Sequence, residues 1–364
     1  MNKNPKKVLS IYRDYFTYDR GTPIRIRSLL REVSKDAEIE LHTASRDEKS
    51  LFNNHHLQLG VKNLKNILEL RKYIKNNKID IVIFHTISAG YYLIPLLFLN
   101  RRYKKVLEMH GFMEEEGRLY NDISFFRYHR NKFLYSVIYG LCDLITTCSE
   151  TASKKMLQYN KNTHTIYGGV DLKKFNSSFV QKEQETEKVG QIIIGYSGNG
   201  RIWQGLEFLL EAFSILSKRD PSFSLHLLLS EKVNIPEMPN VHVFEPVAHD
   251  NVAHFNARCD ILVIPRLDNV VNALSFPSKL MEYLAMGIPV VGSKTSDIHK
   301  IITHRVNGML YNPGDVEDFI NCLIELKNPV LRRKLASNGH LLVKNKYDWT
   351  ELGRSFVSLI KNIK

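Results

Sequence analysis

The sequence is poor in cysteine and has no long apolar run. Only four cysteines occur among 364 residues, and no two form a Cys-x-x-Cys pair. This usage excludes a disulfide framework and fits a reducing compartment. The longest apolar stretch, residues 91–99, is about half of the ~20 residues that a membrane-spanning helix needs. The apolar run at residues 8–11 is too short for the core of a signal peptide. We therefore expect a cytoplasmic protein, either free or peripheral on the cytoplasmic face of a membrane.

Positive charge is concentrated in the first half of the chain. The net charge is +13; residues 1–180 hold 30 Lys and Arg against 18 Asp and Glu, and residues 181–364 hold 21 against 20. Such asymmetry indicates an anionic partner for the first half, either a membrane or nucleic acid. The alternative is a basic surface inherited from a lysine-rich proteome, which would have spread its charge over both halves.

The pattern of apolar runs predicts an α/β protein. Hydrophobic residues make up 43% and charged residues 24%, as in folded globular proteins. Continuous apolar runs, rather than alternating ones, are separated by amphipathic stretches, which favours parallel strands covered on both faces by helices. In the first half these runs are residues 8–12, 39–43, 79–84, 106–109, 144–147 and 164–167; in the second they are residues 192–196, 225–229, 241–244, 261–265 and 289–292.

A polar segment without periodicity, residues 177–190, divides the chain. We expect two Rossmann-like, doubly wound domains facing across a cleft, with ligands beyond the carboxyl ends of the strands. Residues 1–176 form the predicted first domain and residues 191–345 the predicted second domain. Residues 346–364 are predicted to form a C-terminal helix that packs back towards the N-terminal domain.

The segment from residue 275 to residue 287 predicts a phosphate site. Ser275 and Ser278 flank Phe-Pro, and a helix is expected over residues 277–286, closed by Gly287. The start of a helix is electropositive and has unpaired N–H groups, so it can hold a phosphate. Lys279 lies in that first turn, and Glu282 lies one turn later on the same face, where a carboxylate can accept ribose hydroxyls. The alternative is an ordinary surface ion pair.

This stretch resembles the donor-binding signature of the retaining glycosyltransferase family 4, the group 1 glycosyltransferases of GT-B architecture. The matching residues are Lys279-Leu-Met-Glu282-Tyr-Leu-Ala-Met-Gly287-Ile-Pro-Val-Val, followed by Asn-Gly-Met-Leu-Tyr-Asn-Pro-Gly-Asp at residues 307–315. Residues 142–149 and 166–175 resemble two further landmarks of the family. The resemblance implies metal-independent transfer of a sugar, with retained configuration, from a UDP- or GDP-sugar to a lipid-linked or saccharide acceptor. It implies no cofactor and no metal, and a role in cell-surface polysaccharide or glycolipid synthesis. It also implies that the first domain binds the acceptor and the second domain binds the donor.

One family residue is missing. Members usually carry two glutamates separated by seven residues, and Leu274 stands in the place of the first, which contacts the donor sugar. The resemblance therefore leaves sugar recognition to other residues, for which Asn269 and Asn272 are the candidates.

A glycine-rich turn follows the first strand of the second half. Gly198 allows a ligand to approach the backbone closely, but the turn lacks the third glycine of a nicotinamide fingerprint. The family usually has an arginine and a lysine here that contact the diphosphate, and these positions are Asn199 and Gln204 in this chain. Arg201 is the candidate for the missing positive charge, because a guanidinium binds phosphate bidentately. The alternative is a solvated loop arginine.

The N-terminal half offers candidates at strand ends. His110 follows the run at residues 106–109, and in the family a histidine at this point touches the donor sugar. It is followed by Glu114, Glu115 and Glu116, which are either solvated or close to the acceptor hydroxyl. Gly21 lies in a loop that the family places near donor and acceptor.

Basic residues near this loop and in one aromatic stretch indicate the acceptor or membrane side. Arg25 and Arg27 are candidates for an anionic acceptor. Arg127 and Arg130 lie in an aromatic and basic stretch, residues 125–135, that suits a membrane interface and could also stack on nucleic acid. We take the membrane as the predicted partner rather than nucleic acid. The alternative is an ordinary helix packed on the sheet.

Two rival functions remain open. One is a sugar-nucleotide epimerase or phosphorylase on a similar frame. The other is a catalytically weak protein that docks on membranes or nucleic acid, suggested by the basic first half and by Leu274. No metal-ligand spacing is found in the sequence, since His249 and His254 are five apart and do not share a helical i,i+4 face.

Overall fold

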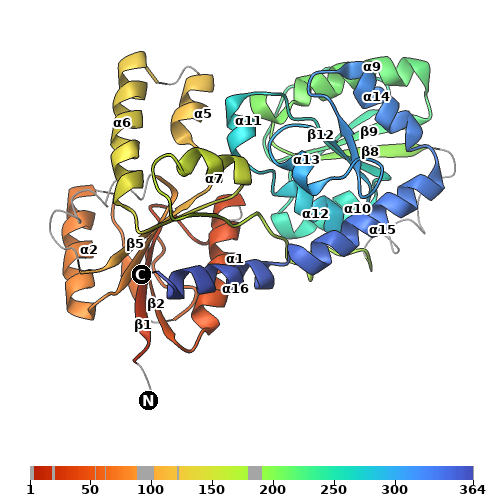
Figure 1. Ribbon diagram of the computed structural model, residues 1–364. Helices are drawn as coiled ribbons and strands as arrows, with labels where there is room; N and C mark the ends of the chain where they lie inside the picture. The colour runs from red at the N-terminus through yellow and green to blue at the C-terminus, as the bar shows by residue number, and fades with distance from the viewer. Residues whose placement is uncertain are drawn as a thin grey trace. The chain divides into compact units, whose positions relative to one another are not determined.

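The computed structural model describes residues 4–18, 21–53, 55–61, 63–87, 102–120, 123–178 and 191–363. The apolar run at residues 91–99 and most of the predicted linker, residues 179–190, lie outside this range. The chain divides into two compact units, one of residues 1–167 with 349–364 and one of residues 168–348. Each unit is an α/β layer structure built on its own sheet (Figure 1).

The first unit is built on a parallel sheet with the strand order β3-β2-β1-β4-β5-β6-β7. Its strands are β1 (Lys6–Ile11), β2 (Ile39–Ser45), β3 (His56–Gln58), β4 (Ile81–His85), β5 (Lys104–Met109), β6 (Leu144–Thr147) and β7 (Thr163–Thr165). Its helices include α1 (Gly21–Lys35), α2 (Asn63–Asn77), α5 (Met113–Leu119), α6 (Phe125–Leu141), α7 (Glu150–Met156) and α16 (Trp349–Lys361). The order reverses between β1 and β4, where α/β sheets usually bind ligands.

Helix α16 belongs to the first unit although it ends the chain. It lies beside α1 (Figure 1), and its buried Phe356 and Ile360 pack in one core with Ile26 and Leu30 of α1. Gly353 permits this approach, because a Cβ there would collide with the side chain of Glu32. The apolar face of α16 thus completes the core of the first unit.

The second unit is built on a parallel sheet with the order β10-β9-β8-β11-β12-β13. Its strands are β8 (Ile192–Gly198), β9 (Phe223–Leu229), β10 (Val241–Phe244), β11 (Ile261–Ile264), β12 (Val290–Ser293) and β13 (Met309–Tyr311). Its helices are α9 (Leu206–Arg219), α10 (Val252–Ala257), α11 (Val270–Leu274), α12 (Lys279–Ala285), α13 (Ile298–Ile301), α14 (Val316–Glu325) and α15 (Pro329–Lys346), with short turns η1 (Ile202–Gln204) and η2 (His249–Asn251). The order reverses between β8 and β11.

The predicted fold class, two doubly wound units with parallel sheets, is confirmed. The apolar runs correspond to the central strands because these strands are buried on both faces; β9, for instance, is buried at all seven positions. The short strands β3 and β13 were not predicted, because three residues are too few to show a periodic pattern. Among the described residues, no helix is both long and apolar enough to cross a membrane.

Candidate functional site

The second unit buries an ammonium group where its strand order reverses. Lys279 begins α12, and its Nζ is buried without a hydrogen-bond partner in the described part of the chain. This nitrogen lies 4.2 Å from the centre of the Tyr196 ring. A side chain at Gly198, the last residue of β8, would collide with it. Burial and the nearby charge of Arg266 lower the pKa of Lys279 to about 7, against a smaller opposite effect of Glu282.

A second cation, Arg266, lies in the same region. It follows β11, the neighbour of β8, and its side chain is buried. Its Nη1 donates a hydrogen bond to Oγ of Ser275 at 3.1 Å. The motif-based reading of the sequence missed this arginine. The available signal was its position, two residues beyond the end of a buried strand, where ligand-binding groups gather in such sheets.

Helix α12 is shorter than the range predicted from the sequence, residues 277–286. The first turn is tight, because the N–H of Leu280 donates to the carbonyl of Pro277 at 3.0 Å and the N–H of Met281 to that of Ser278 at 3.1 Å. Two of the amides expected to face a phosphate are therefore already bonded within the turn. Ser278 is exposed at the start of the helix. Gly287 ends the segment with a φ of 67°, as predicted.

Glu282 points at a histidine on another element. Its Oε1 lies 3.1 Å from Nε2 of His249, which belongs to η2. The His249 ring packs edge-on against Phe175, with 5.5 Å between ring centres. From the sequence, His249 was excluded as a metal ligand and was given no other role. The structure instead makes it the partner that orients the Glu282 carboxylate.

The glycine-rich turn presents Arg201 to solvent. Its guanidinium lies over the Trp203 ring, 5.1 Å from the ring centre, and the residue is exposed. Oδ1 of Asn199 accepts a hydrogen bond from the backbone N–H of Arg201 at 3.3 Å. The backbone carbonyl of Asn199 accepts one from the Tyr196 hydroxyl at 2.8 Å. Gln204 is buried, and its Oε1 has no hydrogen-bond partner among the described residues.

The two asparagines proposed for sugar recognition, Asn269 and Asn272, form hydrogen bonds to the backbone around α11. Nδ2 of Asn272 donates to the carbonyls of Trp203 and Leu267, each at 2.7 Å. Asn269 caps α11, since its Oδ1 accepts from the Asn272 N–H at 2.9 Å. Leu274, in the place of the family's first glutamate, is buried on the same helix. Asn272 Oδ1 is buried without a hydrogen-bond partner among the described residues. This oxygen is therefore available to accept a hydrogen bond from a ligand.

In the first unit, Glu108 is the centre of a buried network. Its Oε1 accepts from Arg25 Nε at 2.7 Å, and its Oε2 lies 3.1 Å from His85 Nδ1 and in contact with His110 Nε2. His85 Nε2 lies 2.9 Å from Ser10 Oγ. These residues come from the ends of β1, β4 and β5 and from α1, at the reversal of strand order.

Charge pairing keeps this carboxylate ionised. Burial alone would raise the pKa of Glu108, but the charges of His110 and Arg25 and hydrogen bonds from both histidines lower it well below its ordinary value. Burial lowers the pKa of His85. His85, Glu108 and His110 could together ligate a metal ion. However, the Arg25 guanidinium already neutralises the carboxylate, and an added cation would meet its charge.

The arginines expected on the acceptor side are placed differently. Arg25 is buried, and its Nη1 and Nη2 donate to the carbonyls of Tyr167 and Ile166 at 2.7 Å each. Arg27 Nη1 donates to the Tyr18 carbonyl at 2.7 Å. Gly21 is exposed and opens α1. Arg25 therefore anchors the site from within the fold rather than from its surface.

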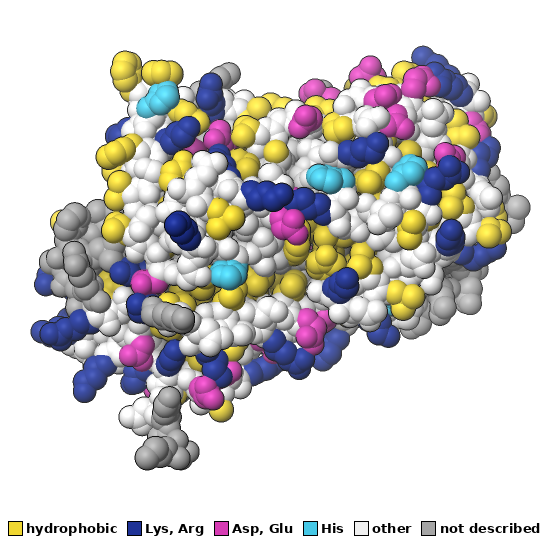
Figure 2. All heavy atoms as spheres, viewed as in Figure 1, with side chains coloured by type: hydrophobic (Ala, Val, Ile, Leu, Met, Phe, Trp, Pro, Cys, Tyr) yellow, Lys and Arg dark blue, Asp and Glu magenta, His cyan; other side chains and the backbone are white. Residues whose placement is uncertain are grey.

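Arg127 and Arg130 are exposed on α6 beside unburied aromatic rings. The buried face of this helix holds Tyr128, Tyr135 and Ile138. On the other side Phe125, Phe126 and Phe133 are 72%, 84% and 68% exposed. Figure 2 shows hydrophobic and basic side chains gathered over α6. One face of α6 is thus packed as in an ordinary amphipathic helix, and the opposite face is apolar and basic.

Two of the three glutamates after His110 are buried rather than solvated. Glu114 and Glu115 are 6% and 7% exposed. Burial raises the pKa of Glu114 to about 6, and Glu115 pairs with Lys155 at 3.1 Å. The sequence could not distinguish these residues from surface acids, because a short helix shows no clear periodicity.

Two protein-family models match the chain. The model described as Glycosyl transferases group 1 matches residues 191–328, and the model described as Glycosyltransferase Family 4 matches residues 21–174. An uncharacterized glycosyltransferase of Methanocaldococcus jannaschii is 20% identical over 328 residues, which cover 83% of this chain and 81% of the relative. Two further curated relatives are matched over only 56% and 54% of their own length.

Solved structures resemble the whole chain. Sucrose-phosphate synthase from Thermosynechococcus elongatus superposes with a TM-score of 0.80 at 16% identity, covering 98% of both chains. Anabaena HepE, solved in complex with UDP-glucose, superposes with a TM-score of 0.75 at 15% identity, covering 98% of this chain and 99% of the other. At this level of identity the likeness concerns the fold.

Proposed function

We propose a function for this chain, which belongs to the group 1 glycosyltransferases of GT-B architecture. It transfers a sugar from a UDP- or GDP-sugar to a hydroxyl of a lipid-linked or saccharide acceptor. The configuration at the anomeric carbon of the sugar is retained. The bond from the anomeric carbon to the diphosphate oxygen breaks, and a bond from that carbon to the acceptor oxygen forms. The acceptor loses its proton, and the nucleoside diphosphate leaves. The proposal includes no metal and no cofactor.

The observation that carries this proposal is the buried Nζ of Lys279 beside Gly198. A buried ammonium without a hydrogen-bond partner is costly, and an anionic ligand offsets that cost. A diphosphate gathers negative charge as the glycosidic bond breaks, so cations fixed near it stabilise the transition state more than the ground state. Lys279 and Arg266 are the cations at this place, and the bare backbone of Gly198 lets the ligand approach.

Glu282 and His110 have supporting roles in this proposal. The Glu282 carboxylate, oriented by His249 at 3.1 Å, accepts the ribose hydroxyls of the donor. His110 orients the donor sugar, and its contact with Glu108 fixes the imidazole. Since Leu274 replaces the family's first acid, the free Oδ1 of Asn272 is the candidate for part of the sugar recognition.

The outer face of α6 supports a lipid-linked acceptor and a peripheral position on the cytoplasmic face of a membrane. Aromatic rings enter the interface between headgroups and acyl chains, and arginines attract anionic lipid. Phe126 and Phe133, with Arg127 and Arg130, provide this combination on one helix. Exposed apolar side chains that gather in one patch rimmed by polar groups, unlike single exposed ones, mark interaction surfaces.

The test is donor binding by the full chain. Thermal shift with a panel of UDP-, GDP- and ADP-sugars identifies the nucleotide, because a ligand at 100 times its Kd adds about 2.7 kcal/mol of stability. Lys279→Ala and Glu282→Ala should bind the selected donor more weakly than the parent, whereas Lys218→Ala, an exposed lysine on α9, should not. If both site variants bind as tightly as the parent, the donor site is wrong. Conversion of the donor without an acceptor would instead indicate an epimerase.

A further inference from the structure

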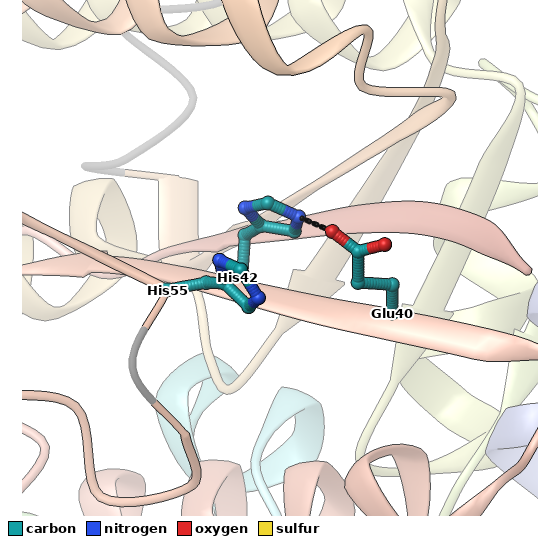
Figure 3. Close-up of side chains that lie close together, drawn as sticks. All are labelled: Glu40, His42 and His55. Carbon is teal, nitrogen blue, oxygen red and sulfur yellow. Dashed lines mark hydrogen bonds and ion pairs between the residues drawn. The ribbon is translucent and has the colours of Figure 1, made fainter.

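Three metal-ligating side chains meet on one face of the first unit's sheet. Glu40 and His42 are two residues apart on β2, so their side chains point to the same face. His55 directly precedes β3, whose His56 pairs with Thr43 of β2, and this register brings His55 alongside His42. Figure 3 shows the two imidazoles side by side, with the His42 ring directed at the Glu40 carboxylate. One ligand atom from each residue lies within 4.8 Å of the other two.

The His42 ring is held in place through both of its nitrogen atoms. Its Nε2 lies 2.8 Å from Glu40 Oε1, and its Nδ1 lies 2.9 Å from the hydroxyl of Tyr73 on α2. Burial lowers the pKa of His42, against the opposite effect of Glu40. A second hydrogen bond on the remote ring nitrogen is the arrangement that orients metal-bound histidines in proteins.

The carboxylate is ionised and the face is open on one side. Burial opposes ionisation of Glu40, but the hydrogen bond from His42 and the ammonium of Lys7 lower its pKa. His55 is exposed, so an ion can reach the group from solvent, and a water molecule can complete its coordination. The charged and titratable groups around His42 are Glu40, His55, Lys7 and Tyr73.

We propose that Glu40, His42 and His55 bind a divalent transition-metal ion of the zinc type. Two imidazole nitrogens and one carboxylate oxygen are a donor set that Zn²⁺ accepts, with water as the fourth ligand. The ion replaces the proton that Nε2 of His42 shares with Glu40. The neutral ring then carries its proton on Nδ1 and donates it to the oxygen of Tyr73. No residue of this group lies among those proposed to hold donor, sugar or acceptor. The site is thus separate from the sugar-transfer site.

The same geometry predicts how binding is regulated. Lys7 Nζ lies 3.2 Å from Glu40 Oε1, the oxygen that faces His42. The ion and this ammonium compete for one oxygen, and Lys7 is exposed enough to turn into solvent. A bound ion would also join β2 to the segment before β3 and stabilise this edge of the sheet.

Titration calorimetry of the full, EDTA-treated chain with Zn²⁺ tests the proposal. We expect one stoichiometric ion in the parent and at least tenfold weaker binding in His55→Ala, an exposed substitution that leaves the fold intact. His164→Ala, an exposed histidine on β7 of the same sheet, should bind as the parent does. No stoichiometric binding by the parent, or parent-like binding by His55→Ala, would overturn the site.

A variant with the opposite expected effect guards against trivial loss of structure. Lys7→Gln removes the competing ammonium and should tighten Zn²⁺ binding several-fold, with a larger upward shift of Tm on adding Zn²⁺. Weaker binding by Lys7→Gln would contradict an ion at Glu40. Replacing Zn²⁺ by Co²⁺ should give visible absorption of a four-coordinate site in the parent, lost in His55→Ala.

Discussion

The ammonium of Lys279 lies 4.2 Å from the centre of the Tyr196 ring, in a position where the ring face is negative. The ring compensates part of the cost of burying the charge and leaves the N–H donors of the ammonium unused. The Tyr196 hydroxyl in turn donates to the Asn199 carbonyl at 2.8 Å and fixes the ring beneath the turn. This relationship keeps a cation in place before any ligand arrives, which is the preorganisation that electrostatic catalysis needs.

Replacing the ammonium should reduce activity without reducing stability. Lys279→Met keeps the length of the side chain and removes a buried charge without a hydrogen-bond partner, so the free energy of unfolding should stay equal or rise. Transfer should fall by about 10²–10³ in kcat, the usual cost of losing one charge-stabilising group. Steady-state kinetics and urea unfolding measure the two effects, with Lys218→Met as the control. Loss of stability in parallel with activity would point to a structural lysine instead.

The pKa of Lys279, about 7, predicts opposite pH dependences for binding and stability. Donor binding needs the protonated ammonium, so kcat/KM should fall as pH rises above 7, by up to about tenfold per unit. Stability should change the other way. The unfolded chain keeps the lysine proton to a higher pH than the folded chain, so this group's contribution to stability grows between pH 7 and the ordinary lysine pKa. In Lys279→Arg the decline of kcat/KM above pH 7 should disappear; its persistence would assign the titration to another group.

Arg266 and Arg201 should differ in their importance for donor binding. Arg266 is buried near Lys279, whereas Arg201 is exposed over Trp203. Arg266→Gln should weaken binding of the donor nucleotide by at least tenfold, since a charge-assisted hydrogen bond contributes about 1.5–3 kcal/mol. Arg201→Gln should change binding less than threefold. Calorimetric titration with the nucleoside diphosphate separates the two, and a larger effect at Arg201 would restore the role predicted for it from the sequence.

The sequence predicted the parts of the site that depend on local pattern. Lys279, Glu282 and Gly287 stand out in the sequence because they fall within one helix and its closing turn, and the structure places them there. The parallel sheets were found because strands buried on both faces are continuous apolar runs. Arg266 was missed, since a single arginine after a strand has no pattern of its own.

The buried network of the first unit could not be predicted, for a topological reason. Arg25, His85 and Glu108 are far apart in the chain and meet where β1, β4 and β5 end side by side. Only the strand order brings them together, and the sequence does not state that order. Burial of Arg25 followed from the same cause, so a first-turn arginine that looked free for an anionic acceptor is bonded within the fold.

Removing the carboxylate of Glu108 should destabilise the first unit. Glu108→Gln leaves the buried guanidinium of Arg25 without its counter-charge, which typically costs about 3–5 kcal/mol. Because the pKa of Glu108 is lowered in the folded state, its contribution is present at neutral pH and is lost as pH falls towards the folded pKa. Urea unfolding at pH 7 and pH 4 should therefore show a smaller difference between parent and variant at the lower pH. Glu48→Gln, an exposed acid in the same unit, is the control and should change neither value.

The outer face of α6 should bind anionic vesicles through both its aromatic rings and its charges. Phe126→Ser should weaken binding of the full chain to phosphatidylglycerol vesicles by about ten- to a hundredfold, since burying such a side chain contributes roughly 1.5–3 kcal/mol. Arg127→Glu alone should also weaken vesicle binding at low salt. This loss should become smaller as added salt screens the charge. Leu64→Ser, at a residue of α2 that is 72% exposed, matches the loss of apolar surface and should leave binding unchanged. Equal losses in Leu64→Ser and Phe126→Ser would mean that exposed apolar area in general, and not α6, attaches this enzyme to the membrane.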